Sequence, residues 1–136
     1  MTQQPWSPSA LAEARDWIER AVEDLSAAGL LLRSTPPHLG VAVYHAQQAA
    51  EKALKAFLVV HNVSFRLTHN LEELLPQCEA VDAALGQFRP AARVLTPYAT
   101  RFRYPGGPLH PSPTEAEQAV QLADGIVRFV RQRLHP

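Results

Sequence analysis

The sequence contains one cysteine, Cys78, and lacks long apolar runs. A single thiol cannot close a disulfide within the chain, so no disulfide framework holds this fold, and a reducing compartment suits it. The longest apolar runs are a few residues, far short of the roughly 20 needed to span a bilayer, and the N-terminus has no signal-peptide pattern. We therefore predict a soluble, cytoplasmic protein that does not bind a membrane.

An excess of charge of either sign is also missing. The chain has 13 Lys and Arg against 13 Asp and Glu, which gives a formal net charge of +0 with His neutral and a pI of about 7.0. No overall field therefore draws this protein to nucleic acid or to an anionic surface. Any site for an anion has to be local.

The sequence has no metal-binding motif and no phosphate-binding glycine loop. There is no His-Glu-x-x-His and no Cys-x-x-Cys, and none of the histidines has a carboxylate at metal-ligand spacing. Gly106-Gly107 is too short to cradle a phosphate and follows no strand. We predict no metal and no other cofactor. The six histidines are His38, His45, His61, His69, His110 and His135.

Helical periodicity is present along almost the whole chain, and no alternating strand pattern is. The 136 residues are enough for one domain with one core. The sequence predicts an all-α fold, an up-and-down bundle of four long helices with one or two short or kinked ones. A loose segment, residues 1–8, precedes the single domain, residues 9–136.

Proline and capping residues set the expected helix ends. Ser7 or Ser9 begins the first helix, whose apolar residues recur every seven positions, and Ser34-Thr35-Pro36-Pro37 ends it. The expected later helices cover about 39–60, 70–81 and 82–101. Pro90 and Pro97 interrupt the last of these, which we expect to be kinked or broken into two pieces. The final helix starts from a capping box, Ser112 to Glu115.

The stretch Tyr44 to Leu58, YHAQQAAEKALKAFL, has two faces when wound as a helix. One is rich in alanine, which lets a neighbouring helix approach closely. The other aligns donors over about three turns, so this strip can hold an anion. The alternative is a solvated face on which Glu51 pairs with Lys55. The donors of the strip are His45, Gln48, Lys52 and Lys55.

Three short motifs carry a resemblance to a known family. YHAQQAAEKALKA, Thr68-His69 and Arg103-Tyr104-Pro105 together resemble the HEPN domain, named for higher-eukaryote and prokaryote nucleotide binding. The resemblance runs from about Trp17 to Leu134. It implies binding of a nucleotide or RNA, a homodimer, and a small nucleotidyltransferase as protein partner, in several cases as toxin and antitoxin.

The resemblance also implies a mechanism. HEPN ribonucleases carry an Arg and a later His with four to six residues between them. The pair lies between two bundles of a dimer and cleaves RNA without metal. Here Arg103 would hold the phosphate and His110 would be the general base or acid. Two departures are the bulky Tyr104 after the Arg and the prolines and glycines between the pair.

The sequence is also compatible with two other functions. One is a nucleotide- or phosphate-binding module, in which aromatic faces stack on a base and cations meet phosphates at one end of the bundle. The other is a non-catalytic dimeric interaction module that uses the alanine seams and the Arg101-Phe102-Arg103 cluster. The binding site would comprise Tyr44, His45, Gln48, Lys52, His69, Arg103 and Tyr104.

Overall fold

Five α-helices and two 3₁₀ helices make up residues 6–134, the part of the chain that the computed structural model describes, and this part contains no strand. The all-α prediction is confirmed. Residues 1–5 of the segment predicted to be loose, and His135, lie outside the described residues. The elements are α1 (Pro8–Arg33), α2 (Leu39–Val60), α3 (Leu71–Val81), η1 (Ala83–Phe88), α4 (Arg89–Leu95), η2 (Thr96–Ala99) and α5 (Pro113–Leu134).

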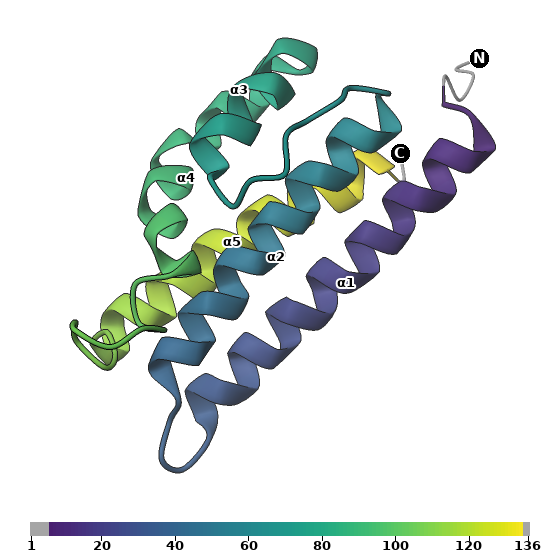
Figure 1. Cartoon of the computed structure of the whole chain (residues 1–136). Helices are drawn as coiled ribbons and strands as arrows, with labels where there is room; N and C mark the ends of the chain where they lie inside the picture. Colours follow the sequence, from purple (N-terminus) through teal and green to yellow (C-terminus); the bar gives the residue numbers. More distant parts are fainter. Residues whose placement is uncertain (1–5, 135–136) are drawn as a thin grey trace.

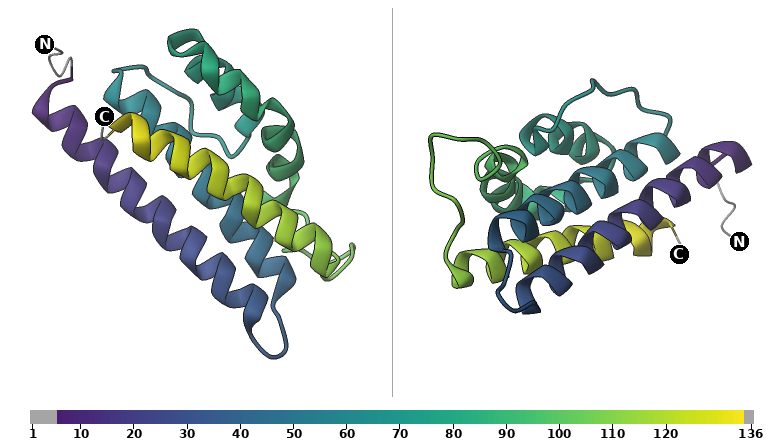
Figure 2. Two further views of the ribbon diagram at one scale, coloured as in Figure 1. Left: turned by 180° about the vertical axis from the view of Figure 1, so that it is seen from behind. Right: turned by 60° about the horizontal axis from the view of Figure 1, so that its bottom comes forward.

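The long helices α1, α2 and α5 lie side by side, and the shorter α3 and α4 lie across α2 on the side away from α1 (Figures 1 and 2). Helix α2 is central, because it contacts each of the other four α-helices. Helices α2 and α5 begin at the same end of the bundle, where the loop formed by residues 100–112 enters α5. No helix in residues 6–134 is long and apolar enough to cross a membrane.

Capping residues and prolines mark the observed ends of the helices. The Ser7 hydroxyl accepts a hydrogen bond from the backbone N–H of Ala10 at 3.1 Å, so Ser7 is the cap of α1. The predicted interruption between residues 82 and 101 is confirmed, but the stretch forms three pieces and not the two expected. Pro90 and Pro97 lie in the first turns of α4 and η2, where a missing N–H costs no hydrogen bond.

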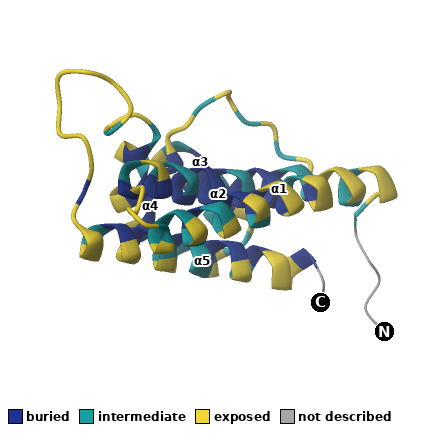
Figure 3. Cartoon of the chain, turned by 90° about the horizontal axis from the view of Figure 1, so that it is seen from below, coloured by how far each residue is buried: buried dark blue, intermediate teal, exposed yellow. Residues whose placement is uncertain are grey.

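The core is built around the alanine face of α2. Ala46, Ala49 and Ala53 are completely buried, as expected for a seam that admits a close neighbour. Figure 3 shows much of α2 in the colour of buried residues. The opposite, polar face is buried as well. Glu51 is 3% exposed and Lys55 is 6% exposed, so the interpretation of this face as solvated is wrong for both residues. Helix α2 therefore carries charged side chains into the interior.

His61, at the C-terminal end of α2, links folding to pH. It packs against the rings of Trp6 and Phe57, at centroid distances of 5.5 and 4.5 Å. Burial lowers the pKa of His61 below its ordinary value of 6.5, and the charge of Asp82 opposes this only in part. The unfolded chain therefore binds a proton at His61 more readily than the native state does.

We expect the stability contributed by His61 to be present above pH 6.5 and to be lost as the pH falls through the lowered pKa. Urea unfolding at pH 7.5 and pH 5.5 measures this. The wild type should lose more free energy of unfolding between these values than His61→Phe does. An equal loss in both proteins would show that His61 titrates alike in the folded and unfolded chain.

Candidate functional site

The loop 100–112 is fixed at both ends by aromatic and polar contacts. Before it, Tyr98 stacks on Phe102 with ring centroids 6.0 Å apart, and the Tyr98 hydroxyl donates to Glu115 of α5 at 2.7 Å. Burial and this bond raise the pKa of Tyr98. Only half of the predicted capping box forms. The hydroxyl of Ser112 accepts from the N–H of Glu115, whereas the Glu115 carboxylate is taken by Tyr98.

The same loop packs on the first turn of α2. A Cβ atom added to Gly40 would lie 3.0 Å from the carbonyl oxygen of Leu109, 3.2 Å from Cβ of Phe102 and 3.9 Å from Cα of His110. A side chain at this position would have to push the loop backbone away by a few tenths of an ångström, so glycine suits the close approach. Gly40 thus places the two ends of the loop, including the backbone of His110, against the start of α2.

Arg103 projects from this loop onto α2. Its guanidinium carbon lies 3.8 Å from the centre of the Tyr44 ring, which is the geometry of a cation–π contact. No carboxylate among residues 6–134 forms an ion pair with Arg103, and the residue is exposed. The other neighbour of Tyr44 is His45, with ring centroids 5.3 Å apart. Arg103 is therefore a positioned cation whose hydrogen-bond donors are free for an anion.

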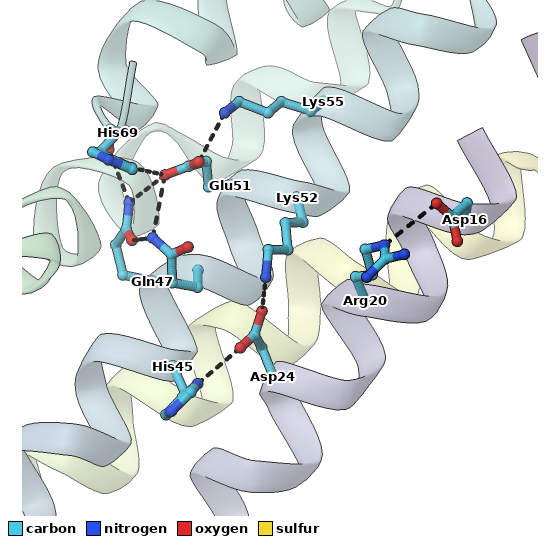
Figure 4. A network of polar contacts seen from close by, with 10 residues as sticks. Asp16, Arg20, Asp24, His45, Gln47, Glu51, Lys52, Lys55 and His69 are labelled. Atoms are coloured by element: carbon cyan, nitrogen blue, oxygen red, sulfur yellow. Dashed lines mark hydrogen bonds and ion pairs between the residues drawn. The ribbon is translucent and has the colours of Figure 1, made fainter. Parts of the chain in front are cut away.

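His45 and Lys52 share one carboxylate, that of Asp24 on α1 (Figure 4). Nδ1 of His45 lies 2.8 Å from Oδ1 of Asp24, and Nζ of Lys52 lies 2.5 Å from Oδ2. Asp24 is only 8% exposed. The two partners compensate for the cost of holding this carboxylate away from water. The cluster ties the middle of α1 to α2.

A second buried carboxylate, that of Glu51, organises the other side of α2 (Figure 4). It accepts from Nζ of Lys55 at 2.8 Å and lies 2.8 Å from Nδ1 of His69. The side-chain amides of Gln47 and Gln48 donate to it at 3.3 and 3.5 Å. Gln47 also donates to the carbonyl oxygen of His69, so this network holds the loop 61–70 against α2.

The residues predicted from the sequence to form one site fall into two groups. Tyr44 contacts both Arg103 and His45, and Lys52 is linked to His45 through Asp24. Gln48 and His69 belong instead to the Glu51 network, and Tyr104 is exposed on the loop. Two cations of the donor strip, Lys52 and Lys55, are engaged by Asp24 and Glu51. The described residues contain no group of three or more His, Cys, Asp or Glu that could hold a metal ion.

The family of the chain follows from comparison with known proteins. The family model described as the HEPN domain matches residues 14–133, which is nearly the entire chain. The chain belongs to the HEPN domain family. The resemblance noted in the sequence is thereby confirmed, and it covers the helices that carry both buried carboxylates and the loop 100–112.

Two solved structures share this HEPN fold. TT1696 from Thermus thermophilus is 34% identical, with a TM-score of 0.75 over 88% of this chain and 96% of that one. ST0689, described as an archaeal HEPN homologue, is 25% identical, with a TM-score of 0.73 over 89% of this chain and 97% of that one. Almost the full length of each of these two structures is therefore matched by this chain.

A relative is also known by sequence. The Methanocaldococcus jannaschii protein named "Putative toxin MJ1304" is 45% identical over 53 residues. The match covers 39% of this HEPN chain and 34% of the relative. The chain therefore spans about a third of that protein's length.

The sequence analysis missed Asp24, which organises the candidate site in this HEPN bundle. A signal for it exists in α1. Asp24 lies seven residues after Trp17 and seven before Leu31, in a line of partly buried apolar residues beside the heptad seam. A carboxylate in such a line predicts a buried partner on the facing helix. The identity of that partner depends on how α1 is rotated against α2.

Gly40→Ala tests whether the loop depends on its close approach to α2. The added methyl group has to displace the backbone at Leu109, so we expect faster amide hydrogen exchange in residues 101–111 with the helical circular dichroism unchanged. Gly125→Ala is the matched control, because its nearest contact is an ordinary 3.7 Å to Phe88. Equal exchange in both variants would contradict this account of the loop.

Proposed function

We propose that this chain is a toxin-like HEPN protein that binds RNA through Arg103 and cleaves it without a metal ion. The observation that carries the proposal is the position of the Arg103 guanidinium. It stacks on Tyr44 with no carboxylate partner, on the loop that packs against the start of α2. A guanidinium held by an aromatic ring retains its in-plane donors, which can grip a phosphate through two parallel hydrogen bonds.

The surroundings of Arg103 favour an anion. Helices α2 and α5 both begin at this end of the bundle, and the N-terminal end of a helix carries partial positive charge and unpaired N–H groups (Figure 1). The nearest ring, that of Tyr44, offers a face on which a nucleobase or the guanidinium itself can stack. With a net charge of +0, the protein depends on this local arrangement to attract RNA.

His110 supplies a group that can transfer a proton. Its Nδ1 lies 3.1 Å from the carbonyl oxygen of Pro111, an acceptor, so Nδ1 carries the hydrogen and Nε2 is left for a ligand. An imidazole titrates near neutral pH and can act on a ribose hydroxyl or on a leaving oxygen. Arg103 would stabilise the charge that develops on the phosphate.

The name of the Methanocaldococcus relative, which contains the word toxin, supports a toxin-like role. RNA is a target whose cleavage would arrest a cell. The homodimer and the nucleotidyltransferase partner expected from the sequence stay predictions. A module that binds a nucleotide or RNA without cleaving it is the alternative, and the same position of Arg103 would serve it.

The test is incubation of the purified chain with a mixed RNA pool in EDTA, beside His110→Ala. Cleavage by the wild type that the variant loses would support a metal-independent ribonuclease with its chemistry on the loop. Absence of cleavage by either protein, together with retained RNA binding in a gel-shift assay, would favour the binding module. Absence of both cleavage and binding would overturn the proposal.

A further inference from the structure

RNA cleavage by the neighbouring 2′-hydroxyl requires two proton transfers. A base removes the proton of the 2′-oxygen as that oxygen attacks phosphorus, and an acid protonates the departing 5′-oxygen. These events occur on opposite sides of the phosphate, since attacking and leaving groups lie roughly in line. Within one bundle, the loop around Arg103 supplies one imidazole, that of His110, so a second proton-transfer group of the same chain has to come from another element.

His45 has the features of a positioned base. Nδ1 of His45 bonds to the buried Asp24 at 2.8 Å, and the carboxylate can only accept, so Nδ1 carries the hydrogen. The other ring nitrogen, Nε2, has no hydrogen-bond partner among residues 6–134, and the side chain is 29% exposed. A carboxylate in this position also stabilises the imidazolium that forms when Nε2 takes up a proton.

Lys52 completes this arrangement. Its ammonium group lies 2.5 Å from the second oxygen of Asp24, so the carboxylate already has a full positive partner. The three side chains carry no net charge when His45 is neutral. The cluster therefore holds His45 in one tautomer and one orientation while leaving it able to accept a proton.

His45 is also in the right place relative to Arg103 and His110. Tyr44 touches both the Arg103 guanidinium, at 3.8 Å, and the His45 ring, at 5.3 Å between centroids. Gly40, which meets the backbone of His110, lies four residues before Tyr44 and hence on the same side of α2, about one turn away. The Arg103–Tyr44 pair thus lies next to His45 and about one turn of α2 from the residue that the His110 backbone approaches, which would bring both imidazoles near a phosphate held by Arg103.

We propose that His45, held by Asp24, is the general base of RNA cleavage and that His110 is the general acid. This inference rests on the proposed function. Nε2 of His45 takes the 2′-hydroxyl proton while the O2′–P bond forms. The P–O5′ bond breaks, and protonated His110 gives its proton to O5′. The products are a 2′,3′-cyclic phosphate and a 5′-hydroxyl, and water returns the proton from His45 to His110.

An RNA oligonucleotide whose scissile 5′-oxygen is replaced by sulfur tests the two roles separately. A thiolate leaves without protonation, so only the base is needed for this substrate. The variants are His45→Gln and His110→Gln, each assayed in EDTA on the sulfur RNA and on ordinary RNA. In His45→Gln the side-chain amide can still donate to Asp24, which preserves the packing between α1 and α2.

On ordinary RNA, each variant should be slower than the wild type by about 10² to 10⁴-fold. On the sulfur RNA, His110→Gln should recover nearly the wild-type rate and His45→Gln should not. Recovery of His45→Gln would overturn its role as base. Wild-type rates for His45→Gln on both substrates would overturn this inference alone, whereas a wild type that cleaves neither substrate would overturn the proposed function with it.

Asp24 acts here as a positioning residue, and Asp24→Asn tests that role. The amide can turn its N–H₂ group toward Nδ1 and favour the wrong tautomer of His45. We expect kcat to fall by at least about tenfold with KM for RNA unchanged. Asp16→Asn, on the exposed side of the same helix, is the matched control and should keep both constants. Equal kcat in the two variants would contradict the role of Asp24.

Discussion

Arg103→Ala is expected to lower the rate of RNA cleavage by about 10² to 10³-fold, because it removes the cation that meets the charge developing on the phosphate. The fold should survive, since Arg103 is exposed and its guanidinium lies on the partly exposed Tyr44 ring. The measurement is the single-turnover rate on a labelled RNA in EDTA, together with the thermal unfolding curve. Arg103→Lys should also be impaired, because an ammonium cannot form the two parallel bonds of a guanidinium.

Arg128→Gln is the control for the loss of one positive charge. Arg128 is an exposed arginine on α5 that pairs with Asp124 at 2.9 Å, away from the loop. The Arg128→Gln variant should cleave RNA at the wild-type rate. If Arg103→Ala cleaved as fast as this control, Arg103 would have no part in the reaction. If Arg103→Ala failed to fold, the residue would have to be reinterpreted as structural.

Glu51→Ala is expected to cost about 3 to 5 kcal/mol of unfolding free energy, because it leaves the charge of Lys55 buried without a partner. The Lys55 side chain is 8% exposed and lies between the rings of Trp17 and Phe65, 5.6 and 5.7 Å from their centroids. His69 would lose its anchor at the same time. Urea unfolding followed by circular dichroism measures the change.

Glu19→Ala, at an exposed position on α1, is the control and should change the unfolding free energy by less than about 0.5 kcal/mol. The loss of unfolding free energy in Glu51→Gln should lie between those of Glu51→Ala and Glu19→Ala, since the amide oxygen of Gln can still accept from Lys55. A loss in Glu51→Ala no larger than that in Glu19→Ala would mean that the Glu51 network does not support the bundle. RNA cleavage by these variants should be measured under conditions in which each variant is still folded.

Local chemistry was enough to predict most of the helices. The helix expected over about 70–81 begins after Asn70, whose side chain accepts from the N–H of Glu72 at 2.9 Å. Pro90 and Pro97 were expected to interrupt the stretch before the loop, and they do. Such features involve residues a few positions apart, so the sequence contains both partners side by side.

The burial of Glu51 and Lys55 was not predictable in the same way. Their i,i+4 spacing correctly predicts the ion pair, which forms at 2.8 Å. Whether such a pair faces water depends on what packs over it. Here the loop 61–70 folds back onto α2 and places His69 on Glu51, a contact between residues 18 positions apart. Nothing in the helical pattern of α2 contains that information.

The candidate site was predictable only in part for the same reason. Tyr44, His45 and Arg103 were selected by residue type and by resemblance, and the fold brings them together. Asp24 was not selected, because its bond to His45 joins two helices across 21 positions and depends on their relative rotation. The sequence predicted that the donors on α2 were available to an anion, because it does not reveal the carboxylates that accept from them inside the bundle. The main one is Asp24, which contacts His45 and Lys52.

We expect RNA to bind at the loop 100–112 and the start of α2. A two-dimensional NMR titration of the labelled protein with an uncleavable 2′-O-methyl RNA tests it most directly, with the Arg103 Nε–H signal included. We predict shifts of that signal and of amides in the loop and in the first two turns of α2. Shifts confined to the groove between α1 and α5 that Val22, Leu25 and Arg131 line, with the Arg103 signal unmoved, would contradict the claim.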